Sequence, residues 1–222
     1  MKNSPGLWKK FLNLFADSSP LMTRVGQVAL LVMCNVCWLV CSLPVITAGA
    51  AVTGLYGVLL ERRGMGFDAV PGTFFRTFRR CWRTATLLWL PALALGAVWL
   101  WAAWLTASHG LVNNAFALLP LLVSGAVWMF TAAWAFPLLA AGGGSAGQVL
   151  RKAFLLGLSE LWRSALMLVL DLLPLALFFL YAQTFMVLAG FWTLLGFALI
   201  ALVKLLVMEP VLRRHTSGSG TR

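Results

Sequence analysis

Charged side chains are scarce in this chain of 222 residues, and acidic ones are the scarcest. Six Asp and Glu stand beside 17 Lys and Arg, and charged residues make up only 10% of the sequence. Hydrophobic residues make up 61%, and the mean hydropathy is +0.91. A water-soluble fold of this length needs far more polar surface than so few charges provide. The composition therefore excludes a soluble domain and predicts one all-α membrane domain, a polytopic helix bundle.

The familiar catalytic motifs are absent as well. The sequence contains no HExxH, no GxSxG and no phosphate-binding loop with its lysine. The glycine run at 142–144 matches such a loop in composition only and is more typical of a flexible connector. The two histidines, His109 and His215, are expected on opposite sides of the membrane, so they cannot share a site. We expect no catalytic residue, no cofactor and no bound metal.

Cysteine is limited to four residues. Cys34, Cys37 and Cys41 share one face of an apolar segment, whereas Cys81 lies in a basic stretch. The first three are candidates for soft metal ligands, but no His or acidic residue lies near them in the sequence. Packing between helices is the favoured interpretation.

The basic residues give a net charge of +11, and they occur in short clusters between apolar stretches. Such clusters are typical of cytoplasmic loops that lie against anionic lipid headgroups. We therefore expect the lipid bilayer as a partner and expect no nucleic acid.

Six apolar segments are expected to cross the membrane. The first is uncharged and about 28 Å long as a helix. Pro44 ends it, and the second segment is slightly short at about 24 Å, so a re-entrant segment is the alternative. A second segment that returned to the outside would leave Arg62 and Arg63 there, so the positive-inside rule favours crossing. The expected spans are 25–43, 45–60, 85–106, 115–140, 164–186 and 191–208.

Six spans place both termini in the cytoplasm and leave 108–114 and about 187–190 outside. The predicted organisation is a cytoplasmic N-terminal segment at 1–24, a membrane domain at 25–209 and a cytoplasmic tail at 210–222. No signal peptide is expected at the N-terminus.

Amphipathic segments lie outside the spans, at 5–16 before the first span and at 71–83 and 149–163 between later ones. The segment at 71–83 is the most cleanly divided, since its aromatic side chains share one face and its arginines share the other. This division predicts a helix in the plane of the inner interface. The basic face consists of Arg76, Arg79, Arg80 and Arg83.

Small residues recur every fourth position in the second span. Gly49, Thr53 and Gly57 form the ridge, with Ala50 and Gly54 one position on. Such a ridge lets helix backbones approach closely, so this helix is predicted at the centre of the bundle.

A weak parallel repeat is also visible at a separation of 80 residues. Residues 74 and 82–85 match residues 154 and 162–165 in type, and each copy leads from an amphipathic segment into a span.

Four polar residues fall inside expected spans: Gln27, Asn35, Asp171 and Lys204. Asp171 and Lys204 lie at matched depths, about 10 Å and 9 Å from the cytoplasmic ends of their helices. Neighbouring antiparallel helices would hold them opposite each other. A structural ion pair, or a lysine that snorkels to the headgroups, is favoured over a gated proton or cation site. Asn35 is expected to form an interhelical hydrogen bond.

The junction of the first two segments resembles the YesL family of bacterial integral membrane proteins. The residues that carry the resemblance are Asn35, Trp38, Leu43-Pro44, Thr47, Gly49 and Gly54-Leu-Tyr56, with Thr53 and Gly57 completing the packing ridge. The downstream stretch at 74–79 is similar as well. The resemblance implies a multi-pass protein of the bacterial cytoplasmic (inner) membrane, of undefined activity, encoded beside carbohydrate uptake genes.

Taken with that resemblance, the sequence predicts a non-enzymatic membrane accessory protein associated with carbohydrate uptake. Carbohydrate ABC transporter subunits and a second copy of the chain are the expected protein partners. The alternative is a small-solute secondary transporter or channel with its path near Asp171 and the small-residue face of the second span.

Overall fold

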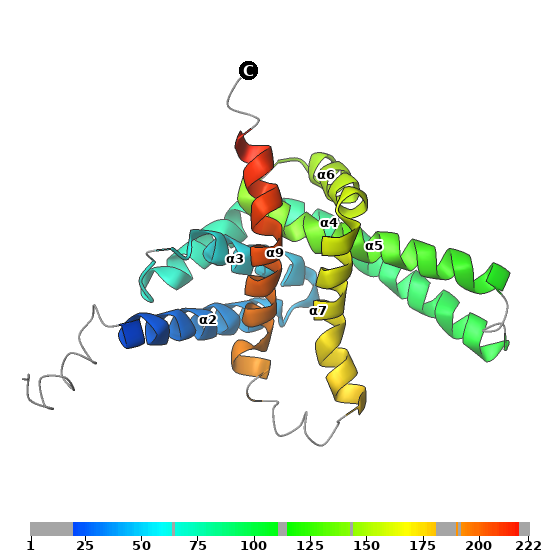
Figure 1. Ribbon diagram of the computed structural model, residues 1–222, viewed down its shortest axis with the longest axis horizontal. Coiled ribbons are helices and arrows are strands. Elements are labelled where there is room, and N and C mark those ends of the chain that lie inside the picture. Colours follow the sequence, from blue (N-terminus) through cyan, green and yellow to red (C-terminus); the bar gives the residue numbers. More distant parts are fainter. Residues whose placement is uncertain are drawn as a thin grey trace, which may run out of the picture.

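The computed structural model describes residues 20–63, 65–110, 115–142, 144–180, 190 and 192–217, and within them every regular element is a helix (Figure 1). The predicted fold class, an all-α helix bundle of membrane type, is confirmed. The amphipathic segment at 5–16 and the loop at 187–189 lie outside the described residues. The elements are α2 (Pro20–Ser42), η1 (Val45–Thr47), α3 (Ala48–Glu61), α4 (Ala69–Ser108), α5 (Ala115–Gly142), α6 (Ala146–Ser159), α7 (Leu161–Leu180), η3 (Trp192–Gly196) and α9 (Phe197–Ser217).

Four stretches of the described chain are long and apolar enough to cross a membrane: Ala69–Ser108, Leu118–Gly142, Leu161–Phe178 and Leu194–Val211. The first two expected spans correspond to shorter apolar helices, Gly26–Ser42 and Val45–Glu61. Length and composition alone therefore identify a membrane-spanning protein with four long candidate spans.

Helix α3 occupies the centre of the bundle, as its small-residue ridge predicts. All residues from Gly49 to Leu59 except Val52 are buried. A Cβ added at Gly49 would lie 2.6 Å from Trp89 Cβ, and one at Gly57 would lie 2.5 Å from Thr77 Oγ1. The ridge thus lets α3 pack antiparallel to α4 with the two helix backbones close together.

Helix α4 is one continuous helix of 40 residues. The sequence predicts an interfacial helix at 71–83 that leads into a span at 85–106, and in the structure the two segments join in a single unbroken helix. No helix-breaking residue lies between the two segments, and the helix also continues through Pro91. Phe74 and Cys81 are buried while Arg76 and Arg79 are exposed, so the two faces are as expected. Much of the aromatic face, however, packs on protein rather than on lipid.

The second copy of the weak repeat has a different shape. Glu160 adopts φ −111° and ψ 50°, which ends α6 and separates it from α7, whereas the corresponding part of α4 is unbroken. Ser164 stabilises this corner, because its hydroxyl donates to Gly157 O at 3.0 Å and accepts from Trp134 Nε1 at 2.9 Å. The matched residues are therefore helical in both copies, and only the second copy has a helix break between them.

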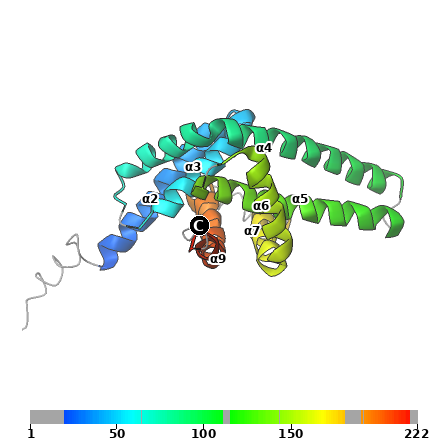
Figure 2. The ribbon, with the colours of Figure 1, turned by 90° about the horizontal axis from the view of Figure 1, so that it is seen from above.

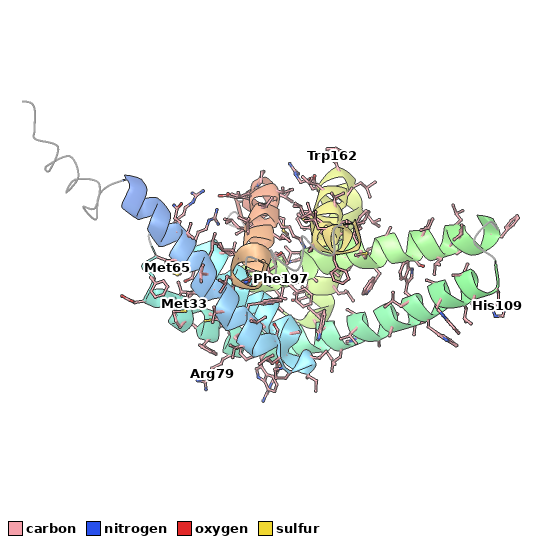
Figure 3. The ribbon with its side chains drawn as sticks, turned by 90° about the horizontal axis from the view of Figure 1, so that it is seen from below. Met33, Met65, Arg79, His109, Trp162 and Phe197 are labelled. Carbon is pink, nitrogen blue, oxygen red and sulfur yellow. The ribbon has the colours of Figure 1, made fainter. Side chains whose placement is uncertain are left out.

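The second half of α4 and the first half of α5 form a two-helix arm that extends away from the other helices, with His109 near its tip (Figures 2 and 3). Tryptophans seated over glycines hold the arm together. Trp99 lies against Gly125 and donates from Nε1 to Leu121 O at 2.8 Å, and Trp128 lies against Gly96.

Helices α7 and α9 run side by side, across the direction of the α4–α5 arm (Figure 1). Helix α9 continues through Pro210 to Ser217. The first eight residues of the predicted tail at 210–222 are therefore helical.

Candidate functional site

Lys204 and Asp171 form an ion pair between α9 and α7. Lys204 Nζ lies 2.8 Å from Asp171 Oδ2 and 3.0 Å from Oδ1. The lysine side chain is 9% exposed and the aspartate side chain 39%. The two residues that share a depth in the sequence are thus brought together, and the pair ties α7 to α9, where other contacts are few.

Tyr56 adds a third member to this cluster, from α3. Its side chain is buried, and it interacts electrostatically with both Lys204 and Asp171. Sequence reasoning singled out Tyr56 only as part of a family motif. The available signal was its rarity, since the chain has two tyrosines and this one lies one turn beyond Thr53 on a helix predicted to be central. One cluster therefore joins three helices.

Asn35 connects α2 to the beginning of α9. Its Oδ1 accepts from the backbone N–H of Ala198 at 3.1 Å, and both residues are buried. Ala198 is the second residue of α9, just beyond the π-helical turn η3, where the hydrogen-bond register changes from i→i+5 to i→i+4. The expected interhelical hydrogen bond is present, and it stabilises this junction.

The other motif residues shape the turn between α2 and α3. Pro44 follows the end of α2, and Thr47 Oγ1 lies 2.7 Å from Cys41 O, so the hydroxyl can donate to a carbonyl in the last turn of α2. The Thr47 backbone N–H donates to Pro44 O at 2.9 Å. Trp89 Nε1 donates to Val45 O at 2.7 Å. Trp38 packs on Phe197 with ring centroids 4.5 Å apart and ring planes tilted by 34°. These contacts give each of these motif residues a place in the packing of the turn.

The arginines of the predicted basic face do not act alike. Arg76 pairs with Glu61 at 2.6 Å, and Arg80 donates to Ala140 O at 3.0 Å near the end of α5, where a cation is favourable. Arg79 points away from the bundle (Figure 3), and Arg83 is exposed as well. Half of the basic face therefore binds other parts of the protein.

Gln27 lies apart from the ion pair, on an exposed part of α2. It lines a groove of about 700 Å³ together with Arg62, Arg63 and leucines of α2 and α9. Of the four polar residues predicted inside spans, Asp171 and Lys204 therefore contact each other, whereas Asn35 and Gln27 lie in two other parts of the bundle.

The cysteines form no centre among the described residues. Cys34 Sγ lies 3.9 Å from Leu55 O and Cys81 Sγ lies 3.9 Å from Leu139 O, both between packed helices. Within the described part of the chain, no three His, Cys, Asp or Glu side chains are grouped to hold a metal ion.

Comparison with known families gives one result. A family model described as "Protein of unknown function, DUF624" matches residues 31–102. The matched stretch covers the second half of α2, all of α3 and α4 as far as residue 102, within the arm, and it includes Asn35, Pro44, Thr47 and Tyr56. No curated protein and no solved structure matches the chain.

Proposed function

We propose that this chain is a non-enzymatic accessory protein of the YesL type in the bacterial cytoplasmic membrane. Its termini lie in the cytoplasm, and it serves carbohydrate uptake by binding ABC transporter subunits. The resemblance of residues 35–56 to that family and the match to a family of unknown function support the assignment.

Helix α6 is the observation that carries the proposal. It has 14 residues, about 21 Å, which is too short to cross a bilayer. One face packs on the bundle through Val149, Ala153 and Gly157. The opposite side exposes large apolar residues beside two cations: Leu150, Phe154, Leu155 and Leu158 lie next to Arg151 and Lys152.

An apolar face beside basic residues suits a contact with another membrane subunit at the inner interface. Trp162, at the start of α7, extends this surface and is 81% exposed (Figure 3). We call α6 together with Trp162 the docking face.

The alternative function is transport through the Tyr56–Lys204–Asp171 cluster. A buried lysine and a carboxylate are the groups that proton and cation carriers use. In this structure, however, the two charges neutralise each other at 2.8 Å. Two cavities at the bundle surface, of about 200 and 700 Å³, have mainly apolar walls. Apolar grooves on the outside of the bundle are expected of an accessory protein.

Affinity purification in mild detergent tests the docking face. We expect transporter subunits to copurify with the wild-type protein. A variant with Leu150→Ala, Leu155→Ala and Leu158→Ala should lose them, because the apolar contact area is removed. The matched control, with Leu119→Ala, Leu122→Ala and Val123→Ala on the exposed side of α5, should retain them.

Two results would count against this role. Equal loss in both triple variants would mean that the contact is not made by α6. Solute flux in proteoliposomes that Asp171→Asn abolishes, without any copurifying subunit, would establish the transporter alternative instead.

A further inference from the structure

The largest groove described above lies in the angle between α2 and α9, beside the end of α3. It measures about 700 Å³. Its walls are leucines of two helices, Leu30 and Leu31 from α2 with Leu202 and Leu206 from α9. Its polar residues, Gln27, Arg62 and Arg63, all lie near the base of the α2–α3 hairpin. The groove is therefore amphipathic along its length.

The two arginines retain the capacity to bind an anion. Arg62 Nη1 donates to Leu59 O at 2.6 Å, which uses one of the five N–H donors of its guanidinium group. Arg63 pairs with Glu209 at 3.0 Å, but 71% of its side chain is exposed. Two cations and one carboxylate leave a net charge of +1 at this end of the groove.

We propose that the groove is a specific site for one anionic phospholipid. Arg62, Arg63 and Gln27 bind the phosphate and its neighbouring hydroxyls, because planar guanidinium groups match phosphate oxygens. The leucines of α2 and α9 contact an acyl chain. Basic pockets between membrane helices on the cytoplasmic side are suited to such headgroups, and the arginines lie where the positive-inside rule places basic residues.

A phospholipid explains both halves of the groove, whereas a free phosphate explains only one. Val28 and Leu206, about half exposed, and the buried Leu30 and Leu31 have no role in binding a small anion. The proposal is independent of the docking face, which lies on α6.

Native mass spectrometry of the full-length protein in detergent tests the site, with phosphatidylglycerol and phosphatidylcholine as probes. We expect phosphatidylglycerol to bind more tightly. Each arginine near an anionic headgroup contributes about fivefold in affinity, so Arg62→Gln with Arg63→Gln should remove most of the preference. Arg79→Gln with Arg83→Gln removes the same charge from an exposed surface outside the groove and should retain it.

A second pair of variants tests the apolar wall. Leu206→Trp narrows the groove without changing its charge and should weaken both lipids, whereas Leu199→Trp, on another part of the exposed surface of α9, should not. The arginine variants test the headgroup contacts and the leucine variants test the acyl-chain contacts, so the whole site requires both results.

Four outcomes would overturn the proposal. These are equal affinity for the two lipids, equal loss in both arginine double variants, and competition by glycerol phosphate as effective as that by the lipid. The fourth is a dimer that excludes lipid, which would assign the groove to a second copy of the chain.

Discussion

The Lys204–Asp171 pair shows how a membrane interior changes the value of a single contact. Either charge alone at this depth is costly, and Lys204 is almost wholly enclosed by α3, α7 and α9. The pair is therefore worth little relative to two apolar residues, yet breaking it by removing one partner leaves the other charge without compensation.

Paired substitutions measure this effect. Asp171→Asn and Lys204→Met should each lower thermal stability in detergent, because each leaves one unpaired charge. The double variant should recover part of the loss, with a coupling of about 1 kcal/mol. Strictly additive losses would show that the two side chains do not stabilise each other and would favour the transporter alternative.

Asn35 gives a second prediction at the scale of one residue. Asn35→Leu removes the acceptor for Ala198 N–H at the junction of η3 and α9, and should cost about 1 kcal/mol of stability. Gln27→Leu is the matched control, because Gln27 is an exposed amide on the same helix. Thermal unfolding in detergent provides the comparison, and similar midpoints for both variants would contradict the role of Asn35.

Among the elements, α3 is the one whose packing depends most on glycines, which have no side chain. Its ridge lies against α4 at distances that leave no room for a methyl group at Gly49 or Gly57. Interior overpacking of this kind destabilises because neighbouring side chains must leave their preferred rotamers.

Gly57→Ala should therefore lower stability by about 1–3 kcal/mol, since the new Cβ would meet Thr77 at 2.5 Å. Gly72→Ala is made in α4, where a Cβ meets nothing within 4 Å, and should be neutral or stabilising by up to about 1 kcal/mol. Denaturation curves of the two variants side by side provide the measurement. A loss at position 72 equal to that at 57 would show that the ridge is not the cause.

At the scale of the whole molecule, the contact of the α2–α3 hairpin with α4 limits how deeply the hairpin enters the membrane. Its turn is fixed beside α4 by the bond from Trp89 Nε1 to Val45 O. Trp89 lies six residues beyond Arg83, about 9 Å along the helix, and α4 continues for about 25 Å more to residue 106. If residues 85–106 cross the membrane, the turn stops well short of the outer side.

We therefore expect α2 and α3 to form a re-entrant hairpin that enters from the cytoplasm and returns to it. A cysteine at Leu43, in the hairpin turn, should not react with an impermeant thiol reagent from outside. Asn113→Cys should react, and Gly143→Cys should not. The wild-type protein, with its four native cysteines, provides the background. Labelling at 43 would restore the six-span topology.

The sequence by itself determined what is set by composition and periodicity. The scarcity of charged residues predicted a helical membrane protein. The four-residue spacing of Gly49, Thr53 and Gly57 predicted that α3 lies at the centre. The similar depths of Asp171 and Lys204 in their helices predicted that the two residues pair. The basic clusters indicate one side of the membrane but cannot count spans, because a re-entrant hairpin and a pair of spans leave Arg62 on the same side.

Only the tertiary structure decided which distant segments meet. The Asn35–Ala198 contact joins residues 163 positions apart, and Tyr56 reaches Lys204 from another helix. The uninterrupted α4 and the groove between α2 and α9 also depend on the direction in which helices cross. That direction follows from the fit of whole helix surfaces, such as Trp89 on Gly49, and the pattern along one helix does not contain it.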